Sequence, residues 1–194
     1  PEQPLPYALS GIALMMQKQF AEALPLFEKG VELTDDKPEL RSQFYSYLAD
    51  CYYNLDSVER AFKMFDEVLK INPNDILVLN NYAYYLSVER RDLDKAEEMS
   101  YKTVKAEPNN ATYLDTYAWI LFEKGNYAEA RIYIDNAMKS DGGKSDVIVE
   151  HCGDIYFMTG DVEGALGYWK KALEMGSESK TLKQKIEKKK FIAE

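Results

Sequence analysis

The sequence predicts an all-helical fold built from tandem two-helix repeats. An alanine followed four positions later by a bulky residue returns along the chain, and successive alanines stand 34 to 38 residues apart. A second pattern, in which large and small residues are spaced by three and four, precedes each of these alanines. Because such spacings place residues on one face of a helix, each repeat contains two amphipathic helices. A period in this range is the signature of a repeat architecture.

The small residues of the two patterns predict how the helices of one repeat cross. The pairs of alanine and bulky residue in the second helices are Ala23/Phe27, Ala61/Phe65, Ala96/Ser100, Ala130/Ile134 and Ala165/Trp169. Ser100 is the one residue of this set that is not bulky. The small residues of the first helices are Gly11, Ala49, Ala83, Ala118 and Gly153. Small side chains at a crossing let helix axes approach to about 8–10 Å. We therefore expect these positions to meet inside each hairpin.

Turn residues separate the predicted helices. Gly125 and Gly160 stand where a helix ends in the left-handed conformation. Asn126 and Asp161 follow them and are expected to cap the next helix, with Glu129 completing a capping box for Asn126. The pairs Asn72-Pro73 and Glu107-Pro108 are expected to end second helices, since proline cannot continue them.

These five copies resemble the tetratricopeptide repeat family over residues 5–175. The resemblance implies a right-handed α-α superhelix of five helical hairpins and a C-terminal capping helix. The expected layout is a single domain, 1–194, with repeats at about 4–37, 42–75, 76–110, 111–145 and 146–178 and the capping helix at 179–192.

The stretch 117–171 further resembles bacterial tetratricopeptide proteins that are often exported or lipid-anchored. The resemblance rests on the segments Asp115-Thr116-Tyr117-Ala118-Trp119, His151-Cys152-Gly153-Asp154 and Tyr168-Trp169-Lys170-Lys171. That resemblance implies a periplasmic or lipid-anchored bacterial protein, with a cytoplasmic location as the alternative. The chain begins with Pro1 rather than Met, and the helix around Leu9 and Ile12 is apolar over more than one face. We therefore expect a fragment of a longer chain, whose upstream repeats cover that helix.

Composition and charge argue against several classes of function. The hydrophobic content of 46% suits a buried core, and no apolar run approaches the roughly 18 residues of a membrane span. The net charge is -9, which disfavours nucleic acid as a partner because its phosphates require Lys and Arg. Cys51 and Cys152 are expected to be free thiols. His151, the only histidine, lacks partners at catalytic or metal-binding spacing, so we expect no enzyme site, metal or cofactor.

The positions left over from packing form a predicted binding face on the concave side of the superhelix. The partner-binding candidates are Asp50, Tyr53, Asn54, Asn80, Tyr84, Asp115, Trp119, Phe122, Glu123, Glu150, Asp154 and Phe157. As assigned, this face contains carboxylates and aromatic rings but no Lys or Arg. Aromatic residues are enriched among interface hot spots. The sequence therefore predicts a protein-interaction scaffold for a basic and apolar segment, and the alternative is a structural or self-associating part of a longer repeat array.

Overall fold

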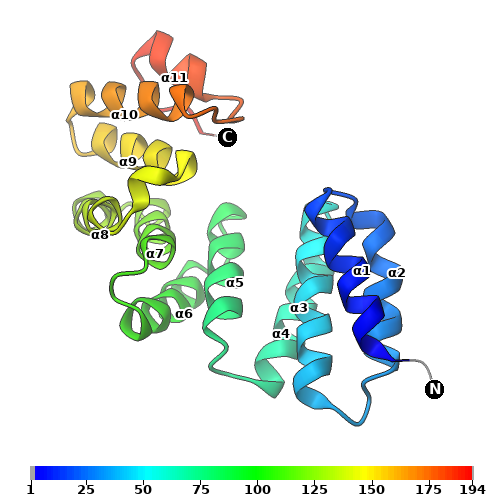
Figure 1. Cartoon of the computed structure of the whole chain (residues 1–194). Coiled ribbons are helices and arrows are strands. Elements are labelled where there is room, and N and C mark those ends of the chain that lie inside the picture. The colour runs from blue at the N-terminus through cyan, green and yellow to red at the C-terminus, as the bar shows by residue number, and fades with distance from the viewer. Residues whose placement is uncertain (1–2, 194) are drawn as a thin grey trace. The chain divides into compact units, whose positions relative to one another are not determined.

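A computed structural model of the chain describes residues 3–193, which hold eleven α-helices, one short 3-10 helix and no strand (Figure 1). The helices are α1 (Pro4–Met16), α2 (Phe20–Glu32), α3 (Pro38–Asn54), α4 (Val58–Ile71), α5 (Ile76–Val88), α6 (Leu93–Ala106), α7 (Ala111–Glu123), α8 (Tyr127–Lys139), α9 (Asp146–Met158), α10 (Val162–Glu174) and α11 (Leu182–Lys188), with the 3-10 turn η1 (Gly142–Lys144) before α9. The predicted all-helical class with two helices per repeat is confirmed.

The chain forms two compact units, Pro1–Val78 and Leu79–Glu194. The N-terminal unit contains α1 to α4, and the C-terminal unit contains α6 to α11 together with most of α5. Consecutive helices pack against one another within the first unit, from α1 on α2 to α3 on α4. In the second unit α7, α8, α9, α10 and α11 form a similar succession. The boundary of a single domain, 1–194, stays a prediction.

The predicted helix crossings are confirmed by burial. The second-helix alanines of all five repeats, among them Ala23 and Ala165, have no exposed surface. A Cβ added at Gly11 would collide with the ring of Phe27, and one added at Gly153 would collide with the ring of Trp169. The bulky residue four positions after the alanine therefore fills the space that the small first-helix residue leaves open.

The core of the N-terminal unit shows how one hairpin packs on the next. Phe27 of α2 stacks on Tyr47 of α3, with ring centroids 4.9 Å apart. Phe44 of α3 lies against Gly30 of α2, so closely that a side chain at position 30 could not be accommodated without movement. Both phenylalanines are fully buried, and their burial stabilises each hairpin through its neighbour.

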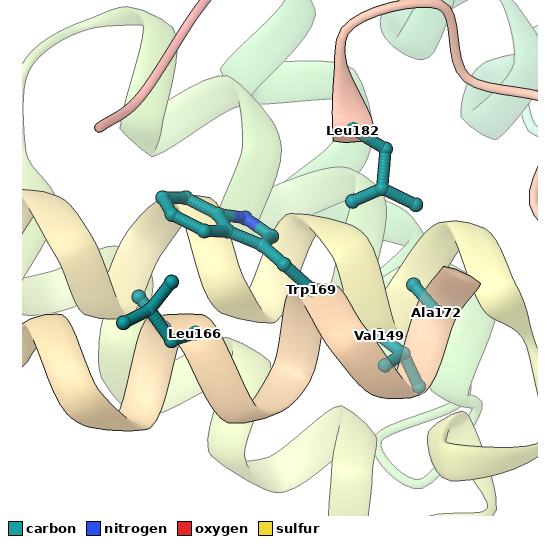
Figure 2. Packing of buried hydrophobic residues seen from close by; sticks show 6 residues of the cluster. Val149, Leu166, Trp169, Ala172 and Leu182 are labelled. Atoms are coloured by element: carbon teal, nitrogen blue, oxygen red, sulfur yellow. The ribbon is translucent and has the colours of Figure 1, made fainter. Parts of the chain in front are cut away.

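In the C-terminal unit a buried cluster joins α9, α10 and α11. Trp169 is fully buried there beside Val149, and Leu182 from the start of α11 covers the cluster (Figure 2). Ile186, one turn after Leu182, packs against the same cluster. The short helix α11 thus covers apolar surface that the last repeat would otherwise expose. It spans Leu182–Lys188 and is shorter than the capping helix expected at 179–192.

The turn predictions have mixed outcomes. Gly125 and Gly160 have positive φ angles of 80° and 90°, and Asp161 accepts a hydrogen bond from the backbone N–H of Gly164, as predicted. The prediction for Asn126 is wrong, because its side chain makes no capping hydrogen bond. Its ψ is 56°, whereas Asn110, which does cap its helix, has a ψ of 110° in the extended region that favours caps.

The expected helix ends and thiols are also found. Helix α4 ends at Ile71 and α6 at Ala106, in each case two residues before the proline. Cys51 and Cys152 are both buried and free. Among the helices of residues 3–193, none combines the length and the apolar character that crossing a membrane requires.

Candidate protein-binding groove

The predicted binding face is divided between the two units. Asp50, Tyr53 and Asn54 lie on α3 in the N-terminal unit, where Asn54 is exposed and donates a hydrogen bond to the backbone carbonyl of Asp50. The other nine residues lie on α5, α7 and α9 of the C-terminal unit. The nine can be described together, and the three on α3 stay predictions.

A cavity of about 1040 Å³ opens in the C-terminal unit between α5, α7, α9 and the residues that follow α10. Five predicted residues line it, and they define what we call the acidic–aromatic groove: Tyr84, Trp119, Glu123, Glu150 and Asp154. Equivalent positions of successive repeats contribute these side chains, because α5, α7 and α9 are the first helices of their hairpins. Six lining residues are acidic and three are Lys or Arg, so the groove is acidic overall.

Two residues that line the groove, Trp119 and His151, belong to a stack of rings. Trp119 lies between two flat neighbours, with its ring centroid 4.7 Å from that of Phe122 and 4.1 Å from that of His151. The planes are nearly parallel, at 11° and 17°. Phe122 is buried under this stack, with 4% of its surface exposed, whereas Trp119 is half-buried. Trp119 is therefore more accessible to a partner than Phe122.

His151 has a partner that its sequence neighbours do not reveal. Its Nδ1 lies 2.9 Å from a carboxylate oxygen of Asp115 on α7, and both residues are buried. Burial lowers the pKa of His151, but the carboxylates of Asp115, Asp154 and Glu150 together outweigh that effect, so the pKa lies above its ordinary value. The repeat period could have indicated this pair. Asp115 and Glu150 occupy equivalent positions of successive repeats, so residue 151 of the next hairpin is expected to lie near Asp115.

Two acidic residues of the groove share one buried lysine. Lys185 of α11 donates hydrogen bonds of 2.8 Å to Glu150 and to Asp154, and only 3% of its side chain is exposed. Trp169 donates through Nε1 to the other oxygen of Asp154 at 2.9 Å. The hydroxyls of Ser177 and Ser179 donate to Glu150. These contacts satisfy both carboxylates within the chain.

The prediction that the face contains no basic residue is therefore wrong. Lys185 enters the groove from α11, and Arg90, which follows α5, pairs with Glu123 at 2.8 Å. Both cations lie outside the first helices from which the face was assigned. From the sequence, the Lys residues after Lys180 are expected to form a polar outer surface. No repeat pattern extends into this helix, so the sequence does not indicate which of its side chains face the groove.

Burial and charge act in opposite directions on the lysine and its partners. Burial raises the pKa of Asp154 to about 6, although Lys185 beside it lowers that pKa. Burial lowers the pKa of Lys185, but Asp154 and Glu150 more than compensate, so its pKa is raised above the usual lysine value. At neutral pH the ammonium is thus charged and lies beside an ionised Asp154 carboxylate.

Two predicted face residues point elsewhere. Asn80 is buried, with 4% exposed, and its Nδ2 lies 3.5 Å from the Oδ1 of Asn81. Phe157 packs against Trp169 with ring centroids 5.8 Å apart, so it belongs to the core between α9 and α10. Within the described part of the chain, no group of three or more His, Cys, Asp or Glu side chains is arranged to hold a metal ion.

Comparison with known proteins agrees with this architecture. A family model described as tetratricopeptide repeat matches residues 14–81. The TPR repeat-containing protein PA4667 of Pseudomonas aeruginosa is 29% identical over 140 residues, which are 72% of this chain and 23% of the relative. The human mitochondrial import receptor subunit TOM70 is 26% identical over 175 residues, or 87% of this chain and 28% of the relative. The chain thus spans about a quarter of the length of these curated relatives.

A solved structure shares the fold over nearly the whole chain. The thermophilic TPR protein TTC0263 of Thermus thermophilus aligns with a TM-score of 0.75 at 17% identity, covering 96% of this chain and 98% of that one. The repeated crossings, the turn residues and the matched family model agree. Residues 14–81 match the tetratricopeptide repeat family, and over nearly its whole length the chain has the fold of a tetratricopeptide repeat protein.

Proposed function

We propose that this protein is a non-enzymatic scaffold whose acidic–aromatic groove binds a basic and apolar segment of another protein. Tetratricopeptide repeat proteins generally mediate protein–protein interactions. The observation that carries the proposal is the convergence of Trp119, Glu123 and Tyr84 from two successive first helices, α5 and α7, on one cavity of about 1040 Å³. A cavity of this size suits a few side chains of a peptide.

Charge defines which segment the groove should accept. The lining is acidic overall, and like charges brought together across an interface cost affinity. A lysine or arginine of the partner gains attraction from the same carboxylates, and apolar groups of the partner can pack against the part of Trp119 that remains exposed. We therefore expect no affinity for acidic peptide tails.

A peptide array tests this proposal. Sequences that combine Lys or Arg with Phe, Leu or Trp should be enriched over acidic sequences of the same apolar content. Binding of the best peptides should weaken as salt is raised, because exposed charges are screened over about 10 Å at 0.1 M. Trp119→Ala should remove most binding, and Ile132→Ala, which changes an exposed apolar residue on α8, should not. Enrichment of acidic peptides, or an unaltered response of Trp119→Ala, contradicts the proposal.

A second candidate is self-association through the N-terminal unit. Helix α1 exposes Leu5, Leu9 and Met16 by 65%, 60% and 82% of their surface. Contiguous exposed apolar residues are typical of surfaces that another protein covers. Sedimentation equilibrium over a range of concentrations distinguishes this candidate, since a self-associating chain shows a mass that rises with concentration and Leu9→Ser lowers it.

A further inference from the structure

The residues after α10 do more than cap the last hairpin. Leu182 and Ile186 face the cluster around Trp169, and those two contacts are what a capping helix requires. We define the C-terminal segment as residues 182–193. Two of its other side chains, Lys185 and Phe191, line the acidic–aromatic groove instead.

Phe191 reaches a helix that the cap does not need to cover. Its ring centroid lies 5.3 Å from that of Phe122 on α7, in an edge-on arrangement with an interplanar angle of 69°. The Nζ of Lys185 lies 5.5 Å from the centroid of the Phe191 ring. A cap for α9 and α10 does not account for the contact with Phe122, because Phe122 belongs to the preceding hairpin.

A left-handed residue returns the chain toward the groove after α11. Lys189 has a φ of 49°, and the backbone N–H of Lys190 donates to the carbonyl of Lys185 at 3.2 Å. This geometry resembles a helix C-cap in which glycine is the usual residue. A non-glycine residue adopts this conformation only rarely, and Lys189 does so where the chain turns from α11 toward Phe191.

The contacts of the C-terminal segment match the chemistry proposed for a partner. An ammonium lies between Glu150 and Asp154, and the ring of Phe191 packs edge-on against Phe122, which stacks on Trp119 of the groove lining. We propose that the C-terminal segment is an intramolecular ligand of the acidic–aromatic groove, and that a partner segment with a lysine and an aromatic residue displaces it. This inference rests on the proposed function of the groove.

A peptide copy of the segment is the probe that tests the inference. A labelled peptide with the sequence of residues 182–193 is titrated into the complete chain and into variants at position 189. Lys189→Val and Lys189→Gly remove the same charge, but only glycine adopts the left-handed turn without strain. A groove that is free in only one molecule in ten binds its ligand about tenfold more weakly. We therefore expect binding about tenfold tighter to Lys189→Val, and no tighter to Lys189→Gly, than to the parent chain.

Loss of the contact between Phe191 and Phe122 should also open the groove and strengthen peptide binding. The chain with Phe191→Ser should also bind the peptide about tenfold more tightly than the parent, and Lys188→Gln, which alters an exposed residue of α11, should not. A peptide in which the phenylalanine is serine should lose its binding to every chain. Equal affinity for all the chains, or no binding to any of them, contradicts the inference.

Fluorescence separates this inference from the proposed function. The chain has two tryptophans, and Trp169 is fully buried, so acrylamide quenching reports mainly on Trp119. Phe191→Ser should raise quenching if the segment covers the groove. If unrelated basic and aromatic peptides bind the parent and this variant equally and quenching is unchanged, the groove has its proposed function and the inference fails. If no peptide binds any of the chains, the proposed function fails and the inference fails with it, even where quenching rises.

Discussion

Lys185 and Asp154 form a buried ion pair between α11 and α9, with the ammonium nitrogen 2.8 Å from the carboxylate oxygen and only 3% and 2% of the two side chains exposed. The second oxygen of Asp154 accepts a hydrogen bond from Trp169, so one carboxylate links the groove to the core of the last repeat. The pair therefore connects two properties of the C-terminal unit, its stability and access to the groove.

Removal of the lysine should destabilise the C-terminal unit. Lys185→Met leaves two buried carboxylates without their cation, and breaking a buried pair from one side typically costs about 3–5 kcal/mol. Lys183→Met is the matched control, because Lys183 is exposed on the same helix. Urea unfolding followed by tryptophan fluorescence measures the effect, since both tryptophans lie in the C-terminal unit. Equal unfolding midpoints for the two variants would show that the pair contributes nothing to stability.

Two glycines of the last hairpin should respond oppositely to alanine. Gly153→Ala places a Cβ against the ring of Trp169 and should cost about 1–3 kcal/mol, the usual penalty of overpacking. A Cβ at Gly167 meets nothing within 4 Å, so Gly167→Ala should stabilise α10 by roughly 0.5–1 kcal/mol. Thermal unfolding of the two variants checks both signs. If Gly153→Ala unfolds at the same temperature as the parent chain, Gly153 does not lie at the helix crossing.

The stability of the C-terminal unit should depend on pH through His151. Its folded pKa is raised by Asp115 above the ordinary value of 6.5, against the effect of burial. A group with a raised folded pKa stabilises the fold fully below its ordinary pKa, and that contribution is lost as pH rises through the folded pKa. The free energy of unfolding should therefore fall as pH rises from 6.5.

Two variants serve as controls for this pH dependence. His151→Gln should remove the decline above pH 6.5, and Asp115→Asn should weaken it, because the neutral amide does not favour the imidazolium. The pKa of Asp154 is also raised, to about 6, so its own contribution to stability is lost as pH rises from its ordinary value of 3.8 to about 6. This range lies below that of His151. Urea midpoints measured at several pH values separate the two ranges. An unchanged slope in His151→Gln assigns the decline to another group.

The sequence predicts the architecture well because the fold depends on local, repeated information. The positions of Ala23, Ala165, Gly11 and Gly153 follow from spacings of three and four, and their burial needs no knowledge of distant residues. Helix ends before Pro73 and Pro108 depend on the missing N–H of proline and are equally local. The capping bond expected of Asn126 is not formed, although Asp161 caps its helix from a similar backbone conformation, so the residue type alone does not determine a cap.

The groove is less predictable because its chemistry comes from different repeats and from outside them. The pair of His151 with Asp115 requires knowledge of which side chains adjacent hairpins bring together. Lys185 lies on a helix without a repeat pattern, so no register indicates that its ammonium enters the groove. Similarly, Phe191 reaches Phe122 only because Lys189 adopts a left-handed conformation, which sequence patterns assign to glycine or asparagine.

The central claim is that a basic and apolar segment binds beside Trp119, and the most direct measurement is nuclear magnetic resonance of the indole N–H groups. The two tryptophans give two indole N–H signals, and the indole N–H of Trp169 donates a hydrogen bond to Asp154. On titration with a lysine- and phenylalanine-containing peptide, we expect the Trp119 signal to shift progressively, and a glutamate- and phenylalanine-containing peptide to leave it in place. A Trp119 signal that ignores the basic peptide, or that shifts only with the acidic one, would contradict the account.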